Sequence, residues 1–161
     1  MKRVLALATL LLPAASAWSL EPVAPVDFVA NGAWETGRYP NVANSCFMEG
    51  ETDNEKAVRL AAASKGSFGL TVQRSGGYRT EPVTLAVDAE QPIHATAIAD
   101  FSITATDGLD GDEPSVLLAA MKNGKTLTVT SSSFAPIVVT LEGIEPVLQA
   151  FRACLGWPEN Y

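Results

Sequence analysis

The sequence predicts a mainly β fold of the α+β class, an antiparallel sheet or sandwich with two short helices. Between the two cysteines, apolar and polar residues alternate with a period of two, which is typical of half-buried strands. Two segments depart from this rhythm and carry helix start and stop residues. The chain of 161 residues, 47% of them hydrophobic, is long enough to form one domain with a substantial core.

The first seventeen residues have the organisation of a signal peptide. Lys2 and Arg3 form a basic start, and residues 4–12 are an apolar run too short to cross a bilayer. Ala15 and Ala17 then supply the small-residue pattern at which signal peptidase cleaves. We therefore expect cleavage after Ala17 and a periplasmic or secreted protein. The sequence indicates neither a membrane span nor a lipid-acceptor cysteine after the cleavage site.

The remaining chain divides into an arm and a domain. Residues 18–33 contain Pro22 and Pro25 and are predicted to be an irregular N-terminal arm, followed by a single β-rich domain over 34–161. Lys65-Gly66 is predicted to be a tight turn between two of the strands. Alternation predicts strands at 57–64, 67–73, 82–88, 93–105, 125–131 and 136–142.

Two helices are predicted from periodicity and end signals. Residues 112–125 begin with acidic residues and Pro114 and end with Lys122 and Gly124, which matches the charge preference of helix ends. Residues 146–155 carry an apolar stripe with helical spacing. Its members are Val147, Ala150, Phe151, Cys154 and Leu155. We expect this C-terminal helix to pack on the sheet and to end at Gly156, which suits a left-handed position.

The two cysteines are predicted to form a disulfide. Oxidising compartments convert an even number of cysteines into bridges, and Cys46 is the partner available to Cys154. A reactive thiol is the alternative, but it needs an electropositive site, and Arg152 is the one basic residue near Cys154 in the sequence. Neither cysteine belongs to a C-x-x-C motif. The bridge closes a loop of more than a hundred residues, for which chain entropy predicts about 4–5 kcal/mol of stabilisation.

The charge of the chain excludes some partners. Eleven basic and eighteen acidic residues give a net charge of −7, and removal of Lys2 and Arg3 with the signal peptide leaves −9. Such a chain has no electrostatic footprint for nucleic acid, and anionic lipid would repel it. A cationic partner is permitted, although acidity is also an ordinary means of solubility for a secreted domain.

The acidic segment 107–113 is a weak candidate for calcium binding. Hard cations prefer clustered oxygen ligands, but the spacing does not match an EF-hand loop. Helix N-terminal charges and a solvated turn explain the segment better, so we predict no metal and no cofactor. The four candidate ligands are Asp107, Asp110, Asp112 and Glu113.

Motifs for catalysis are absent from the sequence. His94 is the single histidine, and no G-x-S-x-G elbow, phosphate loop or dinucleotide fingerprint accompanies it. A pair of carboxylates as in glycosidases stays possible, because eighteen acidic residues offer many pairs. We expect a protein that is not an enzyme.

Aromatic residues give a weak indication of a binding surface. Trp34, Tyr39 and Trp157, together with Trp18 and Tyr161, lie toward the two termini, which the predicted disulfide brings together. Such a cluster suits a recognition patch. It suits equally well the closure of a small core, and for Trp157 the core interpretation is preferred.

Several segments resemble the secreted alphaproteobacterial proteins of the invasion-associated locus B type. The resemblance rests on Trp34 followed by Cys46 in "CFME", and on a C-terminal series of "GKTLTVT", "IVVTLEG" and "VLQAFRAC". It covers mainly the last forty residues and the Trp–Cys start. It implies a β-rich fold and a role in the cell envelope or in contact with a host. It transfers no functional residue, because the matched positions are structural ones.

The sequence leaves three functions open. The first is a non-catalytic exported cell-envelope protein that binds a protein or another envelope macromolecule. The second is an acidic inhibitor of a basic secreted enzyme such as a lysozyme or a protease, because the net charge favours fast electrostatic docking. The third is a carboxylate-dependent hydrolase with its site in a cleft of the sheet.

Overall fold

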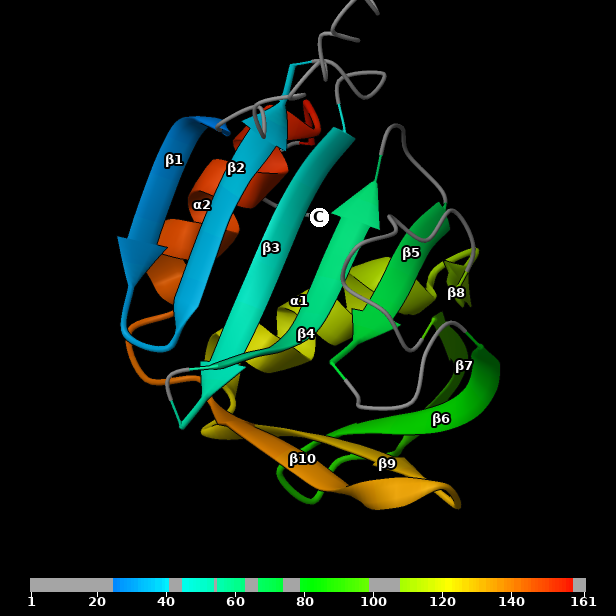
Figure 1. Cartoon of the computed structure of the whole chain (residues 1–161). Coiled ribbons are helices and arrows are strands. Elements are labelled where there is room, and N and C mark those ends of the chain that lie inside the picture. Colours follow the sequence, from blue (N-terminus) through cyan, green and yellow to red (C-terminus); the bar gives the residue numbers. More distant parts are fainter. Residues whose placement is uncertain are drawn as a thin grey trace, which may run out of the picture.

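The computed structural model describes residues 25–40, 45–53, 55–62, 67–73, 79–98 and 108–157. The predicted signal peptide lies outside these residues. The described chain contains ten strands and two helices, and Figure 1 shows their arrangement. The strands are β1 (Val26–Asn31), β2 (Trp34–Tyr39), β3 (Ser45–Thr52), β4 (Glu55–Ala62), β5 (Ser67–Val72), β6 (Thr80–Val87), β7 (Ile93–Ile98), β8 (Gly108–Asp110), β9 (Thr126–Ser131) and β10 (Phe134–Thr140). The helices are α1 (Glu113–Asn123) and α2 (Glu145–Cys154).

The strands form one sheet in the order β1-β2-β3-β4-β5-β7-β6-β9-β10, with β8 paired to β5. Neighbours are antiparallel except at one place, where Thr71 of β5 and Ile98 of β7 pair in parallel. Figure 1 shows β1 to β5 in front of the two helices, while β6, β9 and β10 cross the lower end of the molecule. The predicted fold class, a mainly antiparallel β protein with two short helices, is confirmed.

The alternation of β4 and β5 places two rows of apolar side chains in the core. Val58 and Leu60 of β4 are paired with Val72 and Leu70 of β5, and all four are buried. The same side of β5 presents Phe68, whose ring packs edge-on against Phe151 of α2 at 5.6 Å between centroids and is stacked on Trp157 at 5.4 Å. The core therefore lies between the sheet and the helices.

The sheet curls until its late strands approach its early ones. The indole Nε1 of Trp34 donates to the carbonyl of Thr140 at 2.7 Å, and the Asn31 amide donates to the carbonyl of Gly143 at 2.7 Å. The Trp34 ring lies against Gly50, where a Cβ atom would be 2.8 Å from the ring. The two hydrogen bonds join β1 and β2 to the end of β10 and the turn that follows it.

Helix α2 ends in a Schellman motif. Gly156 has φ +66°, its N–H donates to the carbonyl of Ala153 at 3.0 Å, and the N–H of Trp157 donates to the carbonyl of Arg152 at 2.9 Å. The helix contacts β1, β2 and β3, so the predicted packing of the C-terminal helix on the sheet is confirmed. The predicted stop at Gly156 is also correct.

The disulfide between Cys46 and Cys154 is present, with 6.0 Å between the Cα atoms. Cys46 is buried in β3, while Cys154 at the end of α2 is half-buried. The bridge closes a separation of 108 residues and attaches the last helix to the third strand. No helix among the described residues is long and apolar enough to cross a membrane.

Part of the predicted N-terminal arm is wrong, because residues 26–31 form the edge strand β1. Its apolar residues Val26 and Phe28 stay exposed, and Asp27 takes φ +55° at a bulge. An edge strand needs one neighbour and tolerates a preceding proline such as Pro25, so the prolines do not prevent it. The signal for a buried strand is absent here, which explains the error.

The predicted long strand 93–105 is shorter in the described chain. β7 ends at Ile98, and residues 99–107 lie outside the described residues. β8 then pairs with β5 through Leu109 opposite Phe68. The predicted turn at Lys65-Gly66 also lies outside the described residues, although the strands on either side of it are paired as expected.

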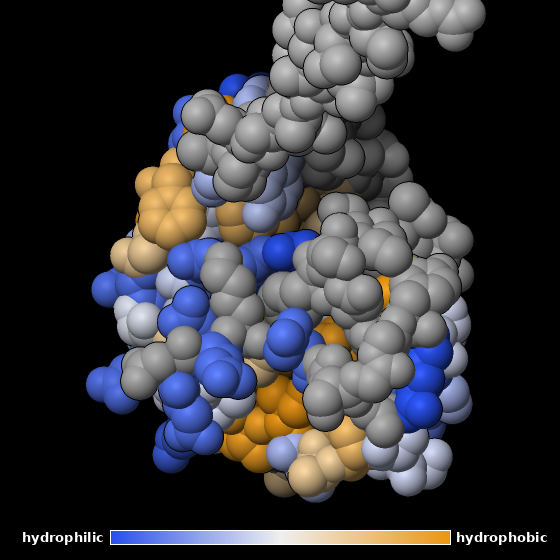
Figure 2. Space-filling view, viewed as in Figure 1, coloured by the Kyte–Doolittle hydropathy of each residue, from blue (hydrophilic) through white to orange (hydrophobic). Residues whose placement is uncertain are grey.

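Both outer edges of the sheet carry irregularities. Each of β1 and β10 has a register shift against its neighbour, and β10 contains Pro136. Both also expose apolar groups, including Phe28 and Val138, and Figure 2 shows apolar areas over β1 and at the lower end beside β10. Bulges and proline protect edge strands from pairing with other chains, so these two edges are poor templates for strand addition.

Candidate functional site

The strands β7, β6 and β9 present an outer face rich in hydroxyl groups. Thr84 of β6 pairs with His94 of β7 on one side and with Thr130 of β9 on the other. The next residues along the strands, such as Leu85 and Val129, are buried in the core. Because successive side chains point to opposite faces, threonines line the outside and aliphatic residues fill the inside.

A groove of about 880 Å³ lies on this face and extends to the turn between β8 and α1. A second lobe of about 400 Å³ lies along α1 and shares His94 and Glu113 with the first. We call the two lobes together the His94 groove. The described residues of the larger lobe are Pro82, Val83, Thr84, His94, Ala95, Thr96, Gly108, Gly111, Glu113, Thr130, Ser131 and Ser132. The smaller lobe adds Gln91, Pro92, Ile93, Asp112 and Val116.

The imidazole of His94 is exposed in this groove. Its Nδ1 lies 3.4 Å from the Oγ1 of Thr84 across the strand pair. This contact orients the ring, and the carboxylate of Glu113 lines the same two lobes. The sequence prediction that His94 begins a strand after Pro92 is confirmed.

One edge of β7 is open at His94 in the part of the chain that the structure describes. Antiparallel pairs alternate between those that exchange two hydrogen bonds and those that exchange none. Pro82 has no N–H, so its pair with Thr96 belongs to the second kind. The pair of Thr84 with His94, two residues along, is then also of the second kind, and the main-chain groups of His94 point away from β6. Ala95, in the intervening pair, bonds to β6 instead.

On the side of β7 that faces away from β6, the neighbouring strand is β5, which contacts β7 near the C-terminal end of β7. β5 pairs with β7 at Ile98 alone among the described residues. A Cβ atom on Gly108 of β8 would lie 2.9 Å from the carbonyl oxygen of Thr96 and 2.8 Å from the amide nitrogen of Leu70, so glycine is required for this close approach. Among the described residues, the edge is therefore covered at Thr96 and open from His94 toward Ile93.

The first turn of α1 forms the opposite wall of the groove. Asp112 is the N-cap residue but makes no side-chain capping hydrogen bond, while its carbonyl accepts from the Ser115 hydroxyl at 2.8 Å. Val116, one turn into the helix, is 54% exposed and lines the smaller lobe. The wall therefore combines acidic groups with an apolar contact.

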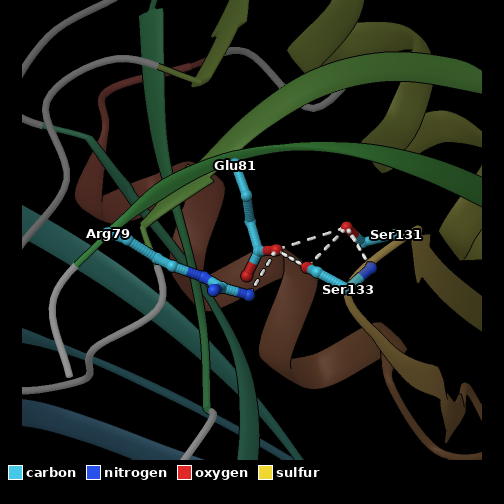
Figure 3. A network of polar contacts seen from close by, with 4 residues as sticks. All are labelled: Arg79, Glu81, Ser131 and Ser133. Carbon is cyan, nitrogen blue, oxygen red and sulfur yellow. Dashed lines mark hydrogen bonds and ion pairs between the residues drawn. The ribbon is translucent and has the colours of Figure 1, made fainter. Parts of the chain in front are cut away.

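A second polar cluster includes Ser131, which forms one end of the groove. Figure 3 shows the carboxylate of Glu81 facing Arg79, Ser131 and Ser133. The Oε2 of Glu81 lies 3.4 Å from an Arg79 nitrogen and accepts from the Ser131 hydroxyl at 3.3 Å and from the Ser133 hydroxyl. Glu81 is buried, so these donors offset the loss of its hydration and attach the β9–β10 turn to β6.

Sequence reasoning missed two buried carboxylates. Glu81 lies two residues before the buried Val83 on the same strand, so its side chain points to the same, inner face. A charge in this position needs hydrogen-bond partners. Glu49 of β3 is fully buried and forms an ion pair with Arg59, its register partner on β4. The alternation along β4 shows in the sequence which face of the strand Arg59 occupies. Its partner can be identified only once the register between β3 and β4 is known.

Asp88 lies in the turn after β6, with φ +49°. Its carboxylate accepts from the N–H of Lys125 and from the N–H of Thr126, each at 2.9 Å. The hydrogen bond from the Lys125 main chain is the main reason that the pKa of Asp88 is lowered from its ordinary value of 3.8. This contact attaches the start of β9 to the end of β6.

The aromatic candidates do not form a binding patch. Trp34 is 1% exposed and Trp157 is 8% exposed, so both belong to the core. Tyr39 is half-buried and stacks on Phe47 at 4.7 Å between ring centroids. The preferred core interpretation of Trp157 is confirmed, and the burial of Trp34 and Trp157 excludes both from an exposed cluster. Trp18 and Tyr161 lie outside the described chain.

The described acidic candidates for a metal site lie in two different elements. Asp107 lies outside the described residues, Asp110 ends β8, and Asp112 and Glu113 begin α1. Among the residues whose side chains the structure describes, no group of three or more acidic, histidine or cysteine residues could hold a metal ion.

Fold and site define a disulfide-linked, mainly β domain with an open groove between a strand edge and a helix. No protein-family model matches the chain, and no curated protein matches it. Among solved structures, it is similar to the crystal structure of invasion associated protein B from Bartonella henselae, with 22% identity and a TM-score of 0.48. The similarity covers 78% of this chain and 96% of that one.

Proposed function

We propose that this protein is a non-catalytic exported component of the cell envelope that binds another macromolecule through the His94 groove. The observation that carries the proposal is the groove itself: two connected lobes on an exposed sheet face, bounded by a strand edge that no described strand covers at His94. The disulfide and the basic, apolar and small-residue start of the sequence support export.

The polar groups of the groove support binding rather than hydrolysis. A serine-type triad needs a histidine that a carboxylate orients, whereas the contact that the described residues make with the His94 ring is the Thr84 hydroxyl at 3.4 Å. A pair of glycosidase type needs two carboxylates on opposite sides of the substrate, whereas the two acids among the described lining residues, Asp112 and Glu113, are consecutive at the start of α1, on one wall of the groove. Hydroxyl groups and an imidazole in a shallow groove suit hydrogen bonding to a partner.

The test is a comparative pulldown from periplasmic extract with the mature chain as bait. Thr84→Arg combined with Thr130→Arg fills the larger lobe, and Thr140→Arg, on the exposed part of β10 outside the groove, is the matched control. We expect wild type and control to retain a partner that the double variant loses. Identical bound proteins for all three baits would contradict a binding role of the groove.

A further inference from the structure

We infer that the partner enters the His94 groove as an extended, basic polypeptide segment that adds a strand to the open edge of β7. This inference rests on the proposed function and specifies what the same groove binds. Four observations carry it: the open main-chain edge, the apolar wall on α1, the acidic rim, and the protected state of the other two edges.

The open edge supplies the main-chain hydrogen bonds. The N–H and carbonyl of His94 point away from β6, and no described strand pairs with them. A strand addition uses such alternate donors and acceptors for affinity, while pockets for alternate side chains provide selectivity. The ladder between β6 and β7 has no register shift, so the edge is a regular template.

The α1 wall supplies a contact for side chains of the incoming segment. In an extended segment, successive side chains point to opposite sides. Those that face α1 meet Val116, which is 54% exposed, and Ile93, which is half-buried. Those that point to the outer face of the sheet lie beside His94 and Thr96, which line the larger lobe. The groove therefore accepts an apolar residue on one side and polar residues on the other.

The acidic residues at the rim of the groove favour a positively charged segment. Asp112 is exposed and lines the smaller lobe of the groove beside Glu113. The chain as a whole carries a net charge of −7. A lysine or arginine next to the apolar residue is attracted by this rim, while an acidic segment is repelled.

The other edges argue for the same location. β1 and β10 end the sheet, but each carries a register shift. Asp27 in β1 has φ +55°, and Pro136 in β10 has no N–H to donate. Such features discourage pairing, whereas β7 at His94 has neither. The strand edge beside the groove is thus the most regular template among the described edges.

The experiment selects decapeptides from a random displayed library with the mature, disulfide-bonded chain as bait. Recovered peptides are synthesised, and their affinities are measured by fluorescence anisotropy. We expect sequences without proline that place lysine or arginine beside an apolar residue. N-methylation of alternate peptide nitrogens should weaken binding at least about tenfold, since it removes ladder donors while keeping the side chains.

Variants of the chain locate the binding. Asp112→Asn with Glu113→Gln should weaken binding several-fold and reduce its salt dependence, while Glu142→Gln, an exposed acid far along the chain on the β10–α2 turn, should leave it unchanged. His94→Pro removes one outward N–H and should also weaken binding. If that variant is unstable, the N-methylated peptides still decide the matter without a change in the protein.

Several outcomes overturn the inference. These are a library without enriched peptides, enrichment of acidic or proline-rich peptides, or full binding by N-methylated peptides. A concentration-dependent dimer that His94→Pro abolishes would assign the edge to a second copy of this chain. If the pulldown partner is lost with the Thr84 and Thr130 substitutions but is unaffected by His94→Pro and the acid-to-amide pair, the groove binds without strand addition. The proposed function then survives while this inference fails.

Discussion

The two sides of this molecule differ in how firmly they are held. On the α2 side, a disulfide and packed aromatic rings attach the helix and the residues that follow it to the sheet. On the α1 side, Val116 is exposed, and no described strand pairs with the edge of β7 at His94. The comparison indicates that one side stabilises the domain and the other side is left available for contact.

The largest effect should follow from damage to the α2 side. Phe151 is fully buried and packs against Phe68. Phe151→Ala should lower the free energy of unfolding by about 3–5 kcal/mol, because it removes a buried ring and leaves a cavity. Urea denaturation measures this. Phe28→Ala, at a half-exposed position of β1, is the control and should cost less than about 1 kcal/mol. Equal losses would contradict the comparison.

Removal of the disulfide should have the next largest effect. Cys46→Ala with Cys154→Ala should lower the free energy of unfolding by about 2–5 kcal/mol, since the bridge spans 108 residues. Denaturation of the double variant should not respond to added reductant, whereas wild type should. A double variant as stable as wild type would show that packing alone holds α2 on the sheet.

Asp88 should produce a smaller, pH-dependent effect. Its pKa is lowered by the main-chain hydrogen bond from Lys125, so its contribution is fully present above the ordinary value of 3.8 and is lost as the pH falls through the lowered value. Asp88→Asn should therefore be less stable than wild type at neutral pH, and the difference should shrink in acid. The denaturation midpoints of wild type and Asp88→Asn, compared at neutral pH and in acid, measure this difference. A difference that is unchanged by acid would contradict the assignment.

Sequence patterns captured the α2 side well. The stripe with Phe151 and Cys154 and the stop at Gly156 are local signals, and two cysteines allow a single pairing, so the helix position and the disulfide could be predicted. β1 was missed because an exposed edge strand buries too little apolar surface to leave a period-two signal.

The groove could not be predicted, because it depends on strand order. Nothing local in the sequence places β6 between β7 and β9, and that order brings Thr84 beside both His94 and Thr130. Asp112 was correctly assigned to the start of a helix, but its position opposite the edge of β7 depends on the long connection that precedes β8. Pro82 gives a usable signal only once its register with Thr96 is known.

The central claim, that no other strand pairs with the edge of β7 at His94, is tested most directly by amide hydrogen exchange of residues 18–161, followed residue by residue with NMR. The N–H of Ala95 bonds to β6, whereas the N–H of His94 points into the groove. We predict that His94 exchanges more than about tenfold faster than Ala95 under native conditions, and that a bound peptide from the library slows His94 selectively. Protection of His94 equal to that of Ala95 in the free protein would contradict the account, because the edge would then already be paired.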